Sequence, residues 1–317
     1  MHGRIIKTTL ISSAVLIFAG LLSGPEGVSG PDAPPPGLVA FATPQAAAAD
    51  PRWTAFGDDL KAAIRRQPGD VGFYIKDLKQ GFSIVHNEDH LFPSASLIKV
   101  PVMVAVFQAV EDGRITLDSK VRMSRQDRRG GSGTLRRRRS GTEFKVSHLI
   151  ERMIVESDNT AAHLLISQLG FEYLNRVFVG AGLKDTRIHP EGMKLAWAPV
   201  ARENFTTPRE MAYLLEKIYR REIVSPAACD RMISILKSAG GRDRLALYMP
   251  KSWNIAHKTG LLRGACHDCG IVYAPEGELL VCVLTGGNGS YRKAKRFIAS
   301  VGRKTFRFYT TRQKDAS

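Results

Sequence analysis

Strand-like and helical segments are unevenly distributed along this chain, and that distribution most limits its fold. Two short apolar runs, 71–76 and 82–86, are separated by Lys-Gln-Gly at 79–81 and predict a β-hairpin. Strand-like runs return only in the last third, at 254–258, 270–274 and 279–285. Because strands from both ends enclose a helical middle, we expect one sheet assembled from the two ends, with a helical region inserted between them.

Periodicity and capping signals predict the helices. Apolar residues repeat at three and four positions over 146–154, and a second helix over 160–169 is expected to stop at Gly170. Thr-Pro-Arg-Glu at 207–210 combines a capping box with proline at the first helical position. Further helices are predicted at 53–66, 96–110 and 291–308. Pro101 removes one N–H from the second of these and predicts a bend there.

The first 49 residues predict an export segment followed by a tether. Arg4 and Lys7 precede an apolar stretch over 8–22, and 23–49 is rich in Pro, Gly and Ala. The apolar stretch is shorter than the roughly 18 to 20 residues that a membrane-spanning helix needs. We therefore expect a secreted protein on the periplasmic or cell-wall side, with an uncleaved membrane anchor as the alternative.

The four cysteines leave the disulfide pattern open. Cys266 and Cys269 have C-x-x-C spacing with His267 between them, but a second pair of metal ligands is absent from the sequence. Export permits disulfides, and four cysteines allow three connectivities, one of which would join Cys269 to Cys282. We expect no metal and no cofactor.

A Ser-x-x-Lys motif opens the predicted helix at 96–110. Residues three apart lie on one helical face, so the Lys99 amine can approach the Ser96 hydroxyl. A serine hydroxyl is a weak nucleophile until a base takes its proton, and burial or nearby positive charge can lower the pKa of a lysine enough for that role. Alone the motif is weak evidence, because it arises about once by chance in a chain of this length.

A Ser-Asp-Asn run at 157–159 lies between two predicted helices. All three residue types favour helix starts, so the run can be a simple N-cap. In the functional interpretation, the Ser157 hydroxyl relays a proton to a leaving nitrogen, and the Asn159 amide binds substrate.

A Lys-Thr-Gly run at 258–260 ends a predicted strand. A lysine there is often a solvated edge charge. In the functional interpretation, Lys258 and Thr259 hold a substrate carboxylate, and Gly260 lets the acyl chain lie close to the backbone. The flanking His257 and His267 are expected to be structural.

In this order and context, the three motifs are those of class A β-lactamases and penicillin-binding proteins. From about Trp53 to Tyr309 the sequence resembles that family. The resemblance implies an α+β fold, in which a five-stranded antiparallel sheet is flanked by N- and C-terminal helices and carries an inserted all-helical domain. We expect the α/β domain at 50–117 and 235–312, the helical domain at 118–234, and tails at 1–49 and 313–317.

The resemblance also implies the chemistry. Ser96 would be acylated by a β-lactam, Lys99 would accept its proton, and Ser157 and Lys258 would deliver one to the ring nitrogen. The backbone N–H groups of Ser96 and Leu261 would form the oxyanion hole. Two alternatives stay open: a cell-wall peptide or ester substrate with slow deacylation, and a non-catalytic wall-binding or sensor module. In each case we expect a monomer that binds no specific nucleic acid.

One element of the family pattern is altered. Efficient class A enzymes carry Glu-x-x-Leu-Asn in the Ω-loop, whose glutamate activates the deacylating water. Here the corresponding region, 187–195, contains Glu191 without an Asn companion, and Asn204 and Phe205 stand where the family often has an Arg–Asp pair. Glu191 is either that base or an exposed loop acid, so acylation is better supported than rapid deacylation.

The formal net charge of +16 belongs to the body of the chain, because the first 50 residues contain two basic and three acidic groups. Much of it lies in an arginine-rich stretch at 125–139. The stretch is interpreted as a solvated loop, with contact to an anionic cell-wall polymer as the alternative.

Overall fold

The structure, a computed structural model, describes residues 51–194, 200–275 and 277–315. The predicted export segment and tether lie outside the described residues, as does the C-terminal end of the predicted tail. Among the described helices, none is both long and apolar enough to cross a membrane.

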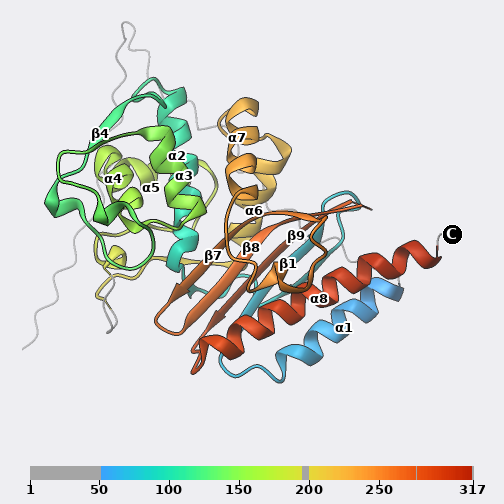
Figure 1. Cartoon of the computed structure of the whole chain (residues 1–317). Helices are drawn as coiled ribbons and strands as arrows, with labels where there is room; N and C mark the ends of the chain where they lie inside the picture. Colours follow the sequence, from blue (N-terminus) through green and yellow to red (C-terminus); the bar gives the residue numbers. More distant parts are fainter. Residues whose placement is uncertain (1–50, 195–199, 276, 316–317) are drawn as a thin grey trace, which may run out of the picture. The chain divides into compact units, whose positions relative to one another are not determined.

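A five-stranded antiparallel sheet runs through the fold in the order β2-β1-β9-β8-β7 (Figure 1). Its strands are β1 (Asp70–Asp77), β2 (Ser83–His86), β7 (Asn254–Leu262), β8 (Ala265–Ala274) and β9 (Gly277–Gly286). The predicted hairpin is β1–β2, and β9 lies between β1 and β8, which joins the two ends of the chain in one sheet. The predicted fold class is confirmed.

Two terminal helices cover one face of the sheet, α1 (Pro51–Ile64) and α8 (Tyr291–Asp315) (Figure 1). Alternate residues of a strand point to opposite faces. Phe73 and Ile75 accordingly belong to the apolar cluster with α1 and α8, whereas Tyr74 belongs to a second cluster on the other face.

That second apolar cluster joins the other sheet face to the helical region. It includes residues of α2 (Lys99–Glu111), α3 (Val146–Val155), α4 (Asn159–Leu169), α5 (Phe171–Gly180), α6 (Pro208–Arg220) and α7 (Pro226–Lys237). Two small ladders complete the region, β3 (Phe92–Pro93) with β6 (Phe205–Thr206) and β4 (Lys120–Arg122) with β5 (Glu143–Lys145). The exact domain limits stay a prediction.

Pro101 fits its helix better than the sequence suggests. A 3₁₀ turn, η1 (Ala95–Ile98), precedes α2, so Pro101 is the third residue of the α-helix. The first four N–H groups of a helix have no intrahelical acceptor, and a proline there removes no helical hydrogen bond. A change of helix type thus lies ahead of Pro101, which costs α2 no hydrogen bond.

The predicted capping box at the start of α6 is only half formed. The Thr207 hydroxyl accepts from the Glu210 N–H at 3.1 Å, as predicted. The buried Glu210 carboxylate instead accepts the N–H groups of Lys184, Asp185 and Thr186. It thereby fixes the segment that leads into the loop at 187–194.

All four cysteines are free thiols and buried. Cys266 and Cys269 are three positions apart on β8 and belong to the apolar clusters on opposite faces of the sheet, so they cannot ligate one metal ion together. Cys269 pairs with Cys282 across β8 and β9. Burial raises the pKa of the Cys269 thiol well above its usual range, and the neighbouring Cys282 raises it further.

Candidate active site

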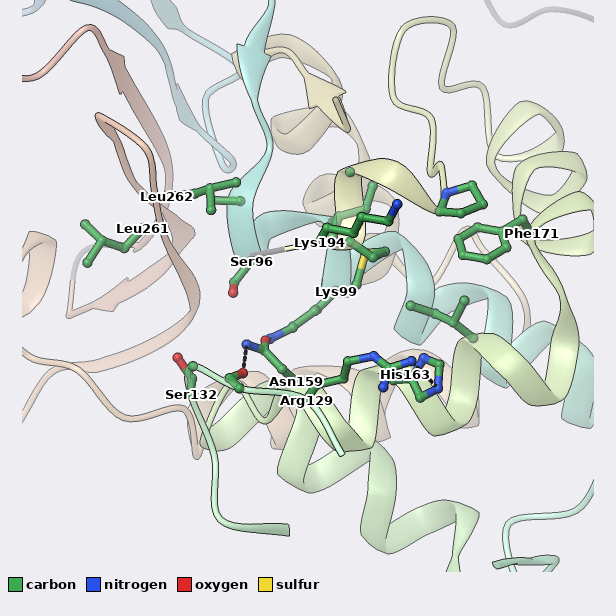
Figure 2. A pocket seen from close by; sticks show the side chains of 18 residues that line it. Ser96, Lys99, Arg129, Ser132, Asn159, His163, Phe171, Lys194, Leu261 and Leu262 are labelled. Carbon is green, nitrogen blue, oxygen red and sulfur yellow. Dashed lines mark hydrogen bonds between the residues drawn. The ribbon is translucent and has the colours of Figure 1, made fainter. Parts of the chain in front are cut away.

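The candidate nucleophile stands at the start of α2. In a 3₁₀ turn residues three apart eclipse one another, so η1 places Ser96 and Lys99 on one face. Ala95 has φ +47°, an uncommon conformation for a residue other than glycine, and it turns the chain sharply just before Ser96. Ser96 and Lys99 both line the same pocket (Figure 2), although no hydrogen bond joins their side chains within the described residues.

Two contacts fix the backbone ahead of Ser96. His267 is fully buried, and its Nε2 donates to the Pro93 carbonyl at 2.8 Å while its Nδ1 accepts from the Thr285 N–H at 3.2 Å. Burial lowers the pKa of His267 to about 4, so the ring is neutral. The Ser94 N–H donates to the Asn204 carbonyl at 2.6 Å. His267 is thus a positioning residue between β8 and the nucleophile turn, in line with the structural role predicted for it.

Lys99 is 2% exposed, and its amine is surrounded by three acceptors. Nζ lies 2.5 Å from the Ser157 carbonyl oxygen, 2.7 Å from Asn159 Oδ1 and 3.1 Å from Ser157 Oγ. Burial lowers the pKa of Lys99 well below its usual range, and the positive charge of Lys258 lowers it further, against the opposing effect of Asp158. A neutral amine at this position can accept a proton.

Ser157 lies in the sharp connection between α3 and α4, with φ +54°. The next residue, Asp158, caps α4 by accepting the Ala161 N–H at 2.9 Å, and its second oxygen accepts the Leu135 N–H at 2.8 Å. Gly133 packs directly on that carboxylate, since a Cβ there would lie 2.1 Å from it. The N-cap interpretation therefore applies to Asp158. The Asn159 side chain is left to line the pocket, and the Ser157 hydroxyl contacts Lys99 and Lys258.

Asn159 is held in place from two directions. Its Nδ2 donates to the Gly130 carbonyl at 2.8 Å, and its Oδ1 accepts from Lys99 (Figure 2). Its backbone N–H donates to the Ser132 carbonyl at 3.1 Å. These bonds fix the orientation of the amide and tie the Gly-Gly-Ser segment at 130–132 to α4.

Lys258 reaches the site from β7. It is 2% exposed, and its Nζ donates to Ser157 Oγ at 3.0 Å and to the Thr259 carbonyl at 2.9 Å. Burial lowers the pKa of Lys258 to about 7, and the charge of Arg244 lowers it while Asp268 opposes the shift. The Ser157 hydroxyl therefore lies between two buried amines, those of Lys99 and Lys258.

Close packing brings β7 to the nucleophile turn. A Cβ on Gly260 would lie 3.2 Å from the Cβ of Ala95 and 3.0 Å from the His267 ring, so a larger residue would push the strand away. Leu261, the next residue, is 43% exposed and lines the pocket together with Ser96. The two predicted oxyanion donors thus border one cavity. Thr259 lies beside Lys258 on the same strand.

A buried His–Asp pair next to Lys258 joins β7 to β8. His257 Nδ1 lies 2.8 Å from Asp268 Oδ1, and Asp268 Oδ2 accepts the Leu245 N–H at 3.1 Å. Both side chains are at most 1% exposed and neither lines the pocket. His257 is therefore placed as a structural residue, as expected.

The pocket has a volume of about 710 Å³, within the range of small-molecule sites. Its ionisable lining side chains among the described residues are Lys99, Arg129, His163 and Lys194, and none is acidic (Figure 2). Residues 195–199 read Leu-Ala-Trp-Ala-Pro and contain no acid either. The cavity therefore favours an anionic ligand on charge alone.

Glu191 lies next to this pocket without lining it. Pro190, Gly192 and Met193 contribute to the lining, whereas Glu191 does not. Its Oε2 is buried without a hydrogen-bond partner among the described residues. The assignment of Glu191 as the base for deacylation stays a prediction, and the geometry does not add to it.

Asn204 fastens the loop that carries Glu191, a role that the sequence did not reveal. Its Oδ1 accepts the His189 N–H at 2.7 Å, and its Nδ2 donates to Met193 Sδ at 3.3 Å. A Cβ on Gly192 would lie 2.4 Å from Asn204 Oδ1, so the loop passes tightly over this amide. The only sequence signal was the replacement of the usual Arg–Asp pair near this position.

Comparison with known proteins gives a consistent result. Residues 55–309 match the family described as Beta-lactamase2, the beta-lactamase enzyme family. β-Lactamase L2 of Stenotrophomonas maltophilia is 27% identical over 277 residues, which cover 84% of this chain and 90% of that protein. β-Lactamase VEB-1 of Pseudomonas aeruginosa is 24% identical over 235 residues, 70% of this chain and 78% of that protein.

Solved structures show the same similarity. The β-lactamase of Sphaerobacter thermophilus superposes with a TM-score of 0.74 at 29% identity and covers 80% of this chain and 96% of its own. PBP-A superposes with a TM-score of 0.75 at 30% identity and covers 81% of this chain and 97% of its own. A leucine-to-glutamate mutant of PBP-A has been solved as an acyl-enzyme complex with penicillin G.

Proposed function

Because this chain belongs to the β-lactamase enzyme family, we propose that it is a serine hydrolase whose Ser96 is acylated by β-lactams and deacylated slowly. One observation carries the proposal: the Ser157 hydroxyl lies between the buried amines of Lys99 and Lys258, at 3.1 and 3.0 Å. This arrangement supplies both a proton acceptor near the nucleophile and a proton donor for the leaving nitrogen.

Acylation follows from the protonation states that burial imposes. Lys99, with its strongly lowered pKa, accepts the Ser96 proton as Oγ attacks the lactam carbonyl. The backbone N–H groups of Ser96 and Leu261 stabilise the tetrahedral oxyanion. Lys258 donates to Ser157 Oγ, and the Ser157 hydroxyl passes its own proton to the ring nitrogen as the C–N bond breaks.

Substrate binding uses the positive charge of the site. A β-lactam carries a carboxylate beside the ring nitrogen, and Lys258 with the Thr259 hydroxyl, in the middle of β7, would hold it. Gly260 keeps the strand close to the acyl chain, because any larger residue would contact Ala95 and His267. Asn159, fixed by Lys99 and Gly130, would receive the amide of the acyl side chain.

Slow deacylation is proposed from the composition of the loop side. Hydrolysis of the acyl-enzyme needs a base that activates water, and no carboxylate is among the described lining residues. The similar PBP-A, whose leucine-to-glutamate mutant was solved as an acyl-enzyme complex with penicillin G, supports acylation by a penicillin as the first step.

A cell-wall peptide is the second candidate substrate. The observation in its favour is the pair of cationic lining side chains, Arg129 and Lys194, with no acid among the described lining residues. A peptide that ends in a carboxylate would match this charge, and the same Ser96 would attack its amide carbonyl. Export from the cytoplasm, proposed from the first 49 residues, would place the enzyme where such peptides occur.

Intact-mass measurement after addition of penicillin G tests the proposal. A long-lived adduct of one ligand mass that disappears over minutes to hours is the expected result. An adduct that turns over within seconds would instead identify an efficient β-lactamase. A peptide thioester that ends in a carboxylate is the second ligand. If neither penicillin G nor this thioester modifies the chain, the enzymatic proposal is wrong and the non-catalytic binding module is the remaining interpretation.

A further inference from the structure

The strongest charge on the molecule lies outside the catalytic motifs, in residues 122–139, which we call the arginine segment. It contains eight arginines and one acid, Asp127, which leaves a net charge of +7 within a chain of net charge +16. Six of the eight side chains are exposed, and Arg129 and Arg136 are half-buried. Because like charges repel one another, this density of positive charge favours the binding of an anion.

None of these arginines is neutralised by an ion pair within the described residues. The nearby acids are taken by other partners: Glu143 by Lys120 at 3.7 Å, Asp118 by Lys145 at 2.8 Å, and Glu156 by Arg152. Asp127 lies 3.3 Å from His163 Nε2. The guanidinium groups of the segment therefore lack a carboxylate from the described part of the protein.

The segment has a defined structure and is not a loose loop. Ser124 and Asp127 form a complete capping box on the 3₁₀ turn η2 (Arg125–Asp127). Leu135, in the turn η3 (Leu135–Arg137), is buried, and Arg128 Nη2 donates to the Arg138 carbonyl at 3.0 Å. The backbone of the segment is thus fixed before a ligand binds, which lowers the entropy lost on binding.

The arginine segment also forms one edge of the Ser96 pocket. Gly130, Gly131 and Ser132, which lie between its two groups of arginines, line the pocket together with Arg129 (Figure 2). A Cβ on Gly130 would lie 3.9 Å from Nη1 of Arg136. A ligand on the segment would therefore lie next to the entrance of the active site.

We propose that the arginine segment is a binding site for a linear polymer of phosphate groups. The planar guanidinium donates two parallel N–H bonds to phosphate oxygens, and several arginines along one structured stretch of chain match a repeating anion. A lipid surface fits less well, because the large exposed apolar side chains of the described residues all lie outside the segment. Binding would keep the Ser96 pocket close to substrates that are attached to the polymer.

Binding of long-chain polyphosphate at stepped NaCl concentrations tests the proposal, with orthophosphate as the monomeric ligand. The test variant is the triple substitution Arg137→Gln, Arg138→Gln and Arg139→Gln. The matched control is Arg65→Gln, Arg66→Gln and Lys79→Gln, which removes the same charge from exposed residues elsewhere. We expect the test triple to bind at least about tenfold more weakly and to reduce the slope of log K against log salt by about 2 to 3.

The control triple should change polyphosphate affinity by less than about threefold. Equal losses in both triples would mean that only net charge matters and would overturn the site. Binding to phosphatidylglycerol vesicles but not to polyphosphate would also overturn it and would identify a lipid surface instead. Acylation by penicillin G, measured in parallel by intact mass, should be the same in the test triple as in the parent chain. The proposed enzymatic function is therefore tested separately.

Discussion

The two sides of the Ser96 pocket differ in the catalytic groups that they supply. On the motif side (Ser96, Lys99, Ser157, Asn159 and Lys258), Ser157 Oγ and Asn159 Oδ1 hydrogen-bond to the buried lysine amines. On the loop side (residues 190–194), Pro190, Gly192, Met193 and Lys194 line the cavity, and Glu191 does not. In the proposed function, the first side forms the acyl-enzyme, whereas no carboxylate of the second side is among the described lining residues.

This difference shows that acylation and deacylation are separable in structure. The motif side depends on three elements that are packed together, η1 with α2, the α3–α4 connection, and β7. The loop side depends on one segment held by Asn204 and Glu210. Substitution of a lining residue on the loop can therefore change release without changing attack.

Loss of the nucleophile should have the largest effect. In Ser96→Ala no hydroxyl remains to attack the carbonyl, so adduct formation with penicillin G should fall at least a thousandfold, roughly to the background. Intact mass gives the readout, and Ser94→Ala, two residues away, is the control that should still be acylated. An adduct of unchanged yield in Ser96→Ala would mean that another residue is the nucleophile.

Replacement of the proposed base should be nearly as severe. An arginine in Lys99→Arg stays protonated and cannot accept the Ser96 proton, so the acylation rate should fall about a thousandfold. Thermal unfolding of the variant shows whether the buried site still folds. A folded variant that is acylated at the normal rate would assign the base to another group.

Introduction of a carboxylate on the loop side should supply a base for deacylation and so reduce the difference between the two sides. Met193 lines the pocket and contacts Asn204, so Met193→Glu would present an acid to the acyl group with an amide to orient it. We expect release of the penicilloyl group to accelerate by about a hundredfold, the scale of general base catalysis. Met193→Gln is the matched neutral control, and equal acceleration in both would show that space rather than charge limits release.

The pH dependence of the acylation rate should follow the protonation state of Lys258. Its pKa of about 7 means that its positive charge is present below that pH and is lost above it. The second-order rate constant for acylation should therefore fall by up to about tenfold per pH unit on the alkaline side. Lys258→Arg, which stays charged, should flatten this limb, and an identical alkaline limb in Lys258→Arg would exclude Lys258 as its source.

Substitution of Glu191 should have the smallest effect. Because this loop lacks the Asn companion of the family's glutamate and no hydrogen bond orients Glu191 Oε2 within the described residues, Glu191→Gln should change the lifetime of the acyl-enzyme by less than about twofold, far below the effect of removing a general base. Deacylation followed by intact mass after removal of free penicillin gives the measurement. A lifetime prolonged by more than tenfold would restore Glu191 as the base.

Most of the fold followed from local patterns. The apolar stripe at 146–154, the proline start of the helix at 208 and the strands at both ends depend on residues within one turn or one hairpin, and the structure has all of them. The order of the strands in the sheet, with β9 between β1 and β8, depends on pairing between distant segments. The sequence predicted one sheet built from both ends, and the resemblance to a known family implied five antiparallel strands, but neither gave this order.

The sequence by itself determined which residues are candidates for catalysis, because Ser-x-x-Lys, Ser-Asp-Asn and Lys-Thr-Gly are each patterns of three or four consecutive positions. Only the tertiary structure decided how they lie together: it buried both lysines, lowered their pKa values, placed Ser157 Oγ between them and left Glu191 Oε2 without a hydrogen-bond partner within the described residues. The physical reason is that desolvation and charge–charge interactions depend on distances between segments far apart in the chain, which no local pattern contains.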